Sequence, residues 1–226
     1  MNTLEDELTR AHDLAVGDLA TAIESSGFEC TRCGACCTRE DDDPHTATVF
    51  PDEVRDLQKS TDREWRDVAR PMPYGLHESE DEAGALEGET FEWALQTDAC
   101  GDCVFYEEEG DEDGTQTGTC TAHDDRPLIC QTYPFSIALE GTSQPMGEAV
   151  DEDGIVRAHE CEGLGRDISR EDAVDLARAL KTRAVRELEE AISVRDEFAP
   201  VAPDPGEVVV HDSEGAKRVD GSPLEE

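Results

Sequence analysis

The chain has 226 residues and a formal net charge of −38, because 57 Asp and Glu residues face only 19 Lys and Arg residues. No stretch is basic enough to bind a polyanion unaided, so we expect neither nucleic acid nor an anionic membrane surface as a partner. Leu, Ile, Val and Phe make up about 19% of the sequence, a level at which highly charged chains are often disordered. Nine cysteines and evenly spread acidic residues argue against disorder. We interpret the acidity as a halophilic surface, whose self-repulsion is screened at high salt.

Neither a targeting segment nor a membrane span is visible. The N-terminal sequence MNTLEDELTRAHDLAV is acidic and amphipathic, whereas a signal peptide begins with basic residues and an apolar run. The uncharged stretch 127–139 contains two prolines and is too short to cross a bilayer. We therefore expect a cytoplasmic protein, in which nine cysteines indicate metal ligands or redox thiols before disulfides.

The first half of the chain contains helix signals separated by turns. Apolar residues at three- and four-residue steps predict one amphipathic N-terminal helix over 4–26, with a Thr3–Asp6 cap and a stop at Gly27, and we assign residues 1–27 to it. Pro51 and a Thr61–Glu64 cap pair predict two short helices, over 51–59 and 62–70. Residues 41–44 read as a polar break.

The second half alternates strands, acidic loops and one long helix. We expect surface loops at 77–89 and 107–118, and short strands at 91–95, 135–139 and 154–156. Ser169 and Asp172 cap a long C-terminal helix, assigned to 166–198, with an apolar stripe of Ala173, Ala177, Leu180, Ala184, Leu188 and Ile192. Residues 199–226 read as an acidic tail, mostly disordered, with a weak hairpin candidate at 208–219.

Four cysteines within eight residues, Cys30, Cys33, Cys36 and Cys37, have the spacing CxxCxxCC. Two residues between thiolates allow a tight turn to direct both sulfurs at one ion, and Gly34 can adopt the positive φ that such a turn requires. Cys36 and Cys37 are adjacent and project differently. They can therefore reach two separate metals, or only one of them is a ligand.

Five further cysteines follow in the sequence. Cys103, Cys120, Cys130 and Cys161 bring the total to eight, enough for two four-thiolate sites, and Cys100 is the ninth. The Cys100–Cys103 spacing also matches a redox CxxC pair. His123 and His159 lie close to cysteines and are alternative ligands. Arg32, Arg39 and Arg126 are placed to lower thiol pKa values or to pair with carboxylates.

The order of these motifs resembles the YkgJ-like CxxCxxCC cysteine-cluster family. The matching segments are CTRCGACC at 30–37, CVFY at 103–106, the C-x5-R-P-x2-C pattern from Cys120 to Cys130, TYPFS at 132–136 and CEGLG at 161–165. The resemblance covers residues 28–165 and implies a zinc- or iron-chelating domain. It departs from the family pattern at His123, where the family usually has Tyr, in a longer acidic loop before Cys120, and in the additional Cys100.

We therefore expect an α+β fold: a small, irregular, metal-stabilised cysteine-cluster domain over 28–165, flanked by helices. The expected function is binding of zinc or iron through cysteine thiolates, the candidate ligands being Cys30, Cys33, Cys36, Cys37, Cys103, Cys120, Cys130 and Cys161. Cys30, Cys33 and Cys36 copy the start of the ferredoxin run, but the immediate Cys37 does not fit its fourth position, which favours zinc over an iron–sulfur cluster.

Two other classes of function are alternatives. The family resemblance extends to flagellin lysine N-methylases, which implies an iron–sulfur-dependent enzyme of protein lysine methyl transfer or redox chemistry. Against this, the sequence has no Gly-rich cofactor loop and no evident general base beside the cluster. A protein-interaction module, in which the long helix docks a protein partner, is the third hypothesis.

Overall fold

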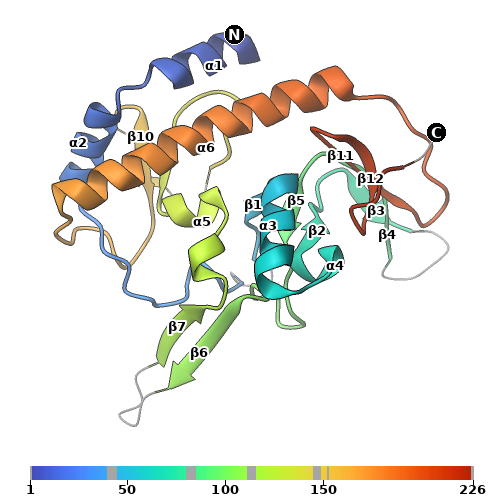
Figure 1. Ribbon diagram of the computed structural model, residues 1–226, viewed down its shortest axis with the longest axis horizontal. Helices are drawn as coiled ribbons and strands as arrows, with labels where there is room; N and C mark the ends of the chain where they lie inside the picture. Colours follow the sequence, from blue (N-terminus) through green and yellow to red (C-terminus); the bar gives the residue numbers. More distant parts are fainter. Residues whose placement is uncertain are drawn as a thin grey trace. The chain divides into compact units, whose positions relative to one another are not determined.

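The computed structural model describes residues 2–39, 45–79, 85–110, 116–144, 149–151 and 153–224; the predicted polar break at 41–44 lies outside them. The chain has the α+β composition expected from its sequence (Figure 1). It divides into two compact units: Met1–Ala47 with Thr97–Glu189 (unit 1), and Thr48–Gln96 with Glu190–Glu226 (unit 2). The cysteine region predicted at 28–165 is therefore interrupted by a segment that folds with the C-terminal residues.

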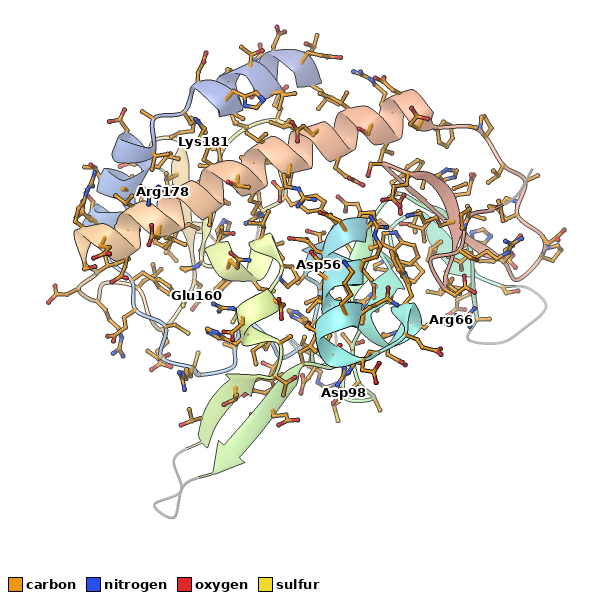
Figure 2. All side chains as sticks on the ribbon, viewed as in Figure 1. Asp56, Arg66, Asp98, Glu160, Arg178 and Lys181 are labelled. Atoms are coloured by element: carbon orange, nitrogen blue, oxygen red, sulfur yellow. The ribbon has the colours of Figure 1, made fainter. Side chains whose placement is uncertain are left out.

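Unit 1 begins with two helices, α1 (Leu4–Asp13) and α2 (Val16–Ser26), where one continuous helix over 4–26 was predicted. The Thr3–Asp6 capping box is present, and Gly27 ends α2 with a φ of 67°. At the break, the ammonium group of Lys181 donates to the carbonyl oxygens of His12 and Leu14 at 2.6 and 2.8 Å (Figure 2). A cation is favourable at the C-terminal end of a helix, so Lys181 stabilises the interruption that the apolar pattern does not reveal.

The remaining short elements of unit 1 are a hairpin, a small sheet, a 3-10 turn and a short helix. They are β6 (Tyr106–Gly110), β7 (Gln116–Cys120), the 3-10 turn η1 (His123–Asp125), α5 (Leu128–Thr132), β8 (Phe135–Ile137), β9 (Ala149–Asp151) and β10 (Val156–His159). Antiparallel pairing gives the strand order β8-β10-β9 and the separate hairpin β6-β7. The segment 107–118, predicted as a loop, thus supplies both strands of a hairpin, because Thr at alternate positions suits an exposed ladder despite the surrounding acidic residues.

Helix α6 (Arg170–Glu197) is the long helix expected from the sequence. Its Ser169 hydroxyl accepts a hydrogen bond from the Asp172 backbone at 3.1 Å, as the cap pair predicted. Within unit 1, the helix packs an alanine-rich stripe against α1, α2 and the β8–β10 strands, and the buried residues are Ala11, Leu19, Ala20, Ile23, Phe135, Ile137, Leu139, Val156, Ala158, Ala173, Ala177, Leu180, Ala184 and Leu188. Across the described residues, no helix has both the length and the apolarity needed to traverse a bilayer.

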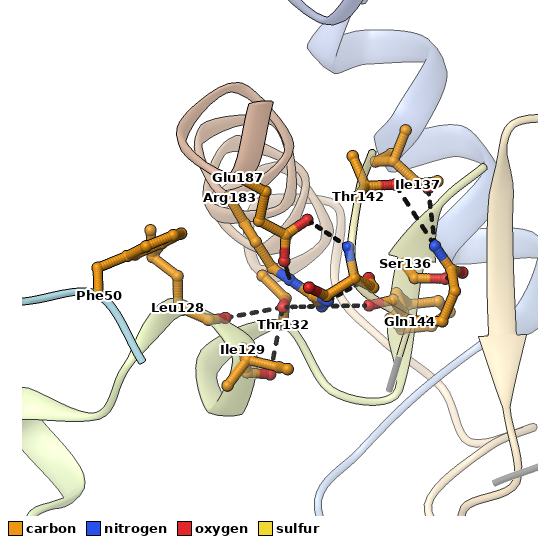
Figure 3. A network of polar contacts seen from close by, with 12 residues as sticks. Phe50, Leu128, Ile129, Thr132, Ser136, Ile137, Thr142, Gln144, Arg183 and Glu187 are labelled. Carbon is orange, nitrogen blue, oxygen red and sulfur yellow. Dashed lines mark hydrogen bonds and ion pairs between the residues drawn. The ribbon is translucent and has the colours of Figure 1, made fainter. Parts of the chain in front are cut away.

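A buried ion pair lies beside this core (Figure 3). The Arg183 side chain is 2% exposed, and its Nε donates to Glu187 Oε1 at 2.7 Å. Its other nitrogens donate to the Thr132 hydroxyl at 3.0 Å and to the Ser143 carbonyl at 2.5 Å, while Glu187 Oε2 accepts from the Ser143 backbone. The guanidinium therefore connects α6 to α5, the helix that contains Cys130, and to the segment after β8.

We expect Arg183→Ala to destabilise unit 1 by about 3–5 kcal/mol, because it leaves the buried Glu187 carboxylate without its charge partner. The matched control is Arg178→Ala on the same helix, whose pair with Asp175 is exposed at 64% and 66%. That change should cost about 0–1 kcal/mol. Chemical denaturation followed by circular dichroism at constant salt measures both, and equal losses would contradict the role assigned to Arg183.

The described residues of unit 2 form two short helices and two small sheets, in addition to the last residues of α6. The elements are β1 (Thr48–Val49), α3 (Pro51–Thr61), α4 (Trp65–Val68), β2 (Ala69–Pro71), β3 (Leu76–Glu78), β4 (Leu86–Thr90), β5 (Trp93–Leu95), β11 (Val208–Asp212) and β12 (Gly215–Arg218). The strand orders are β1-β5-β2 and β12-β11-β4-β3, and β11 pairs with β4 in parallel.

Three sequence expectations for unit 2 need correction. The helix predicted over 62–70 is the single turn α4, begun by Glu64 rather than Thr61 and followed by strand β2. The loop predicted over 77–89 contributes to strands β3 and β4. The hairpin candidate at 208–219 is present as β11 and β12. The prediction that the tail is mostly disordered is therefore wrong. Parallel pairing with β4, a partner more than 100 residues away in sequence, supplies the order that the tail's composition does not predict.

The two tryptophans meet the C-terminal hairpin at the centre of unit 2. Trp93 is 1% exposed and donates from Nε1 to Asp212 Oδ2 at 2.8 Å. Asp212 also pairs with Lys217 at 2.9 Å, and the Lys217 ammonium lies 5.5 Å from the centre of the Trp65 ring. Glu214, in the turn of the hairpin, accepts hydrogen bonds from Arg55 at 2.6 Å and from Lys217 at 2.6 Å. The hairpin is thus fixed by charges as well as by backbone pairing.

The hydrogen bonds from Arg55 and then from Lys217 lower the pKa of Glu214 from its usual 4.5 to about 2, against the opposing effect of burial. A lowered folded-state pKa stabilises the protein fully above the unfolded pKa, and that contribution is lost as the pH falls from about 4.5 to about 2. We therefore expect the melting-temperature difference between wild type and Glu214→Gln to be greatest above pH 4.5 and to shrink below it. A difference independent of pH would contradict this ion pair.

Candidate metal centre

All nine cysteines lie in unit 1, and all nine are free thiols. Cys103 is buried, Cys37, Cys120, Cys130 and Cys161 are half-buried, and Cys30, Cys33, Cys36 and Cys100 are exposed. The eight candidate ligands therefore come from four places in unit 1: the segment 30–37, the hairpin β6–β7 with the turn before it, helix α5, and the loop after β10.

Three backbone hydrogen bonds fix the segment that carries the CxxCxxCC spacing. At its start, the Glu29 N–H donates to the Gly163 carbonyl at 3.0 Å, next to the bridge between Phe28 and Leu164. In its middle, the Arg32 carbonyl accepts from the Gly118 N–H at 2.8 Å. At its end, the Cys37 carbonyl accepts from the Cys103 N–H at 2.8 Å. These contacts bring the segment against the regions that carry Cys161, Cys120 and Cys103.

Tyr106 fills the space between this segment and the hairpin. A Cβ atom at Gly34 would lie 2.0 Å from the Tyr106 hydroxyl oxygen, and one at Gly118 would lie 2.6 Å from Tyr106 Cε2. The hydroxyl donates to Glu108 Oε1 at 2.9 Å. Gly34 has the positive φ, 80°, that the sequence predicted, but the close approach of Tyr106 is a second reason for glycine that a turn argument alone misses.

Gly34→Ala tests this packing, with Gly154→Ala as the matched control. Both glycines have nearly the same positive φ, 80° and 83°, so both variants carry the same backbone strain. Among the described residues, nothing lies within 4 Å of a Cβ at Gly154, whereas a Cβ at Gly34 collides with the Tyr106 ring. We expect Gly34→Ala to cost about 1–3 kcal/mol more than the control, the usual penalty for overpacking. Equal thermal unfolding of the two variants would contradict the packing role.

The adjacent thiols Cys36 and Cys37 interact directly, with their sulfurs 3.8 Å apart. The hydrogen bond from Cys37 is the main cause that lowers the pKa of Cys36 to about 7, and the positive charge of Arg126 lowers it further. The same bond, then burial, then the charges of Cys36, Cys130 and Cys103 raise the pKa of Cys37. One of the two thiols is therefore available as a thiolate near neutral pH, and Arg126 has the electrostatic role that the sequence suggested for it.

The half-buried Cys161 is held by its own loop. Burial is the main cause that raises its pKa, the Gly163 N–H at 3.4 Å from its sulfur lowers it, and the charges of Cys33, Cys36 and Cys30 raise it again. Burial also raises the pKa of Cys120, where the Ala122 N–H and Arg126 act against it and the charge of Cys36 adds to it. The charge of Cys36 thus contributes to the raised pKa of Cys37, of Cys120 and of Cys161.

Two tyrosines near the thiols carried no predicted role. Burial, then the hydrogen bond to Glu108 and the nearby charges of Glu108, Cys37 and Cys33, raise the pKa of Tyr106 to about 12. The Tyr133 hydroxyl donates to the Glu160 carbonyl at 2.5 Å, and burial is the main cause that raises its pKa, followed by the charge of Cys161. Both residues occur in the quoted motifs CVFY and TYPFS. The motif alone does not say that they pack beside the cysteines.

Cys100, His123 and His159, the three additional candidate ligands, contact groups other than the eight clustered thiols. The Cys100 backbone N–H donates to Asp98 Oδ1, within a turn that precedes Cys103 (Figure 2 labels Asp98). His123 is 59% exposed and faces Asp124 at 3.5 Å. His159 is buried on the β8–β10 sheet, where its Nε2 lies 2.9 Å from the Ser136 hydroxyl.

The cluster fits a thiophilic metal by the chemistry of its donors rather than by a finished coordination sphere. Sulfur donors suit zinc, copper(I) and iron–sulfur clusters and do not suit magnesium or calcium. Within the part of the chain that the structure describes, no three Cys, His, Asp or Glu side chains converge closely enough to hold an ion. Binding would therefore require rotation of thiol side chains, of which Cys30, Cys33 and Cys36 are exposed.

Comparison with protein families matches residues 29–162 to the CxxCxxCC family, described as "Putative zinc- or iron-chelating domain". The matched region is more than half of the chain and runs from just before Cys30 to just after Cys161. No curated protein and no solved structure matches the chain.

Proposed function

The chain belongs to the CxxCxxCC family of zinc- or iron-chelating domains, and we propose that it binds its metal through thiolates of the eight-cysteine cluster in unit 1. The observation that carries the proposal is the convergence of three sequence-distant, cysteine-bearing regions on the segment 30–37, through the backbone hydrogen bonds of Glu29, Arg32 and Cys37. Cysteines that served no common site would not require backbone hydrogen bonds to three distant regions of the chain.

Zinc is the occupant that we propose, with iron as the alternative. Both metals accept four thiolates, and closed thiolate zinc sites contribute directly to folding. The immediate succession of Cys36 and Cys37 departs from the ferredoxin spacing, which favours zinc. An iron–sulfur cluster would give the protein the visible absorption of a sulfide-bridged centre. Its presence would support the alternative hypothesis of a methyl-transfer or redox enzyme.

The free and partly ionised thiols support the proposal that the protein resides in a reducing compartment such as the cytoplasm. All nine cysteines are free, and Cys36, with a pKa of about 7, is partly ionised at neutral pH. Thiols of this kind are oxidised readily outside a reducing environment, whereas a bound metal protects them.

Cys33→Ser and Cys100→Ser form a matched pair for testing the proposed function. Both cysteines are exposed, but Cys33 lies in the clamped segment and Cys100 lies outside the family spacing. Metal content is measured by elemental analysis and native mass spectrometry after anaerobic purification in high salt. We expect Cys33→Ser to lose at least one metal equivalent and to lower the melting temperature, and Cys100→Ser to change neither.

Wild-type protein that carries no zinc or iron under these conditions, and takes up neither when reconstituted, would overturn the proposed function. Loss of metal in Cys100→Ser would instead show that the CGDC pair is a chelating unit. In the native protein, Cys100 should also react with a thiol reagent while the metal-bound thiols stay protected, since a metal-bound thiolate is a weaker nucleophile.

A further inference from the structure

The backbone of segment 30–37 is left-handed on both sides of Cys33. Arg32 has a φ of 58° and Gly34 a φ of 80°. Glycine adopts this conformation freely, whereas in Arg32 the Cβ atom crowds the backbone and makes the conformation unfavourable. The Gly34 carbonyl then accepts the Cys37 N–H at 2.7 Å and begins the turn that follows. The conformation around Cys33 is therefore one that the segment does not hold by its own preferences.

The β6–β7 hairpin contacts both left-handed residues. The Gly118 N–H donates to the Arg32 carbonyl at 2.8 Å. The Tyr106 ring lies against Gly34 and against Gly118, so closely that a Cβ atom at either glycine would collide with the ring. Gly118 has no positive φ, so the close approach of its neighbours, rather than its backbone conformation, requires glycine there. Arg32 is thus held by the backbone of the hairpin, and Gly34 by a side chain of the hairpin.

Tyr106 is also connected to the two cysteines at the base of the hairpin. Its N–H donates to the Cys103 carbonyl at 2.9 Å, and it lies directly opposite Cys120 in the β6–β7 ladder. Opposed residues of an antiparallel ladder lie on the same face, so the ring and the Cys120 thiol share one face of the hairpin. The Tyr106 hydroxyl donates to Glu108 Oε1 at 2.9 Å, which fixes the orientation of the ring. One side chain therefore connects segment 30–37 to the backbone that carries both cysteines.

Resting on the proposed function, we propose that Tyr106 is a positioning residue of the metal centre. Its ring packs the hairpin against Gly34 and so fixes the backbone that presents Cys33 to the metal. Within the part of the chain that the structure describes, no three donor side chains converge, so the thiols rotate on binding while this backbone stays in place. The ring thus determines both the affinity for the metal and the geometry of the bound ligands, without itself being a ligand.

Tyr106→Leu removes the ring, whereas Tyr106→Phe keeps it and removes only the hydrogen bond to Glu108. The control is Tyr74→Leu, at a tyrosine of unit 2 that is 72% exposed. Zinc affinity is measured by competition with a chromogenic chelator. We expect Tyr106→Leu to weaken zinc binding by about 10–100-fold, the usual effect of removing a group that orients metal ligands. Tyr106→Phe should retain most of the affinity, and Tyr74→Leu should match wild type.

The visible spectrum of bound cobalt(II) separates positioning from a general effect on stability. The energy and intensity of its bands depend on the arrangement of the ligands, and they are recorded on protein saturated with cobalt. We expect the spectrum of Tyr106→Leu to differ from that of wild type, and the spectrum of Tyr106→Phe to match it. An unchanged cobalt spectrum or an unchanged zinc affinity in Tyr106→Leu would overturn the positioning role, even if the melting temperature falls.

Gly118→Ala displaces the ring without removing it, since a Cβ there would lie 2.6 Å from Tyr106 Cε2, and it serves as the test where Tyr106→Leu does not fold. We expect a lower zinc affinity, and a smaller effect of Gly118→Ala in the Tyr106→Leu background, because residues in contact are coupled. Wild-type affinity in Gly118→Ala, or equal effects in both backgrounds, would contradict the proposal. Wild-type protein that takes up no zinc, cobalt or iron would instead overturn the proposed function itself.

Discussion

The three backbone hydrogen bonds of segment 30–37 are the constraint on which the rest of the site depends. The segment has little secondary structure of its own, and its cysteines are mostly exposed. Hydrogen bonds from Glu29, to Arg32 and to Cys37 attach it to a loop, a hairpin and a turn that are far away in sequence. Tyr106 then occupies the remaining space against Gly34. Thiols that a local turn alone would leave dispersed are brought together by the tertiary fold.

Much of the fold could be predicted from local signals. The cap of α1, the proline at the start of α3 and the stripe of α6 all act within one turn of their own helix, so the sequence displays them directly. Two of the errors lie where a residue or strand far away in the sequence determines the local structure. Lys181 supports the break between α1 and α2, and strand β4 orders the C-terminal hairpin. Neither partner is visible in the composition of the segment that it stabilises.

The candidate site divides in the same way. Spacing predicts eight candidate ligands and sets Cys100 apart from them, because the motif order is a local property of the sequence. Spacing does not indicate which distant regions lie against segment 30–37, since that depends on backbone hydrogen bonds between residues far apart in sequence. The cysteine spacing also does not reveal Tyr106 and Tyr133, whose packing beside the thiols is a consequence of the glycines and loops opposite them.

The bond between Glu29 and Gly163 has a consequence for biosynthesis. At about 5–20 residues per second, its two residues leave the ribosome roughly 7–27 s apart. During that interval the first four cysteines have been made, but the chain that clamps them has not. A nascent chain therefore presents unprotected thiols to any soft metal or oxidant nearby. Metal binding that needs this clamp would therefore follow the synthesis of Gly163, and its fidelity would depend on the thiol-reducing and metal-buffering capacity of the compartment in which the chain is made.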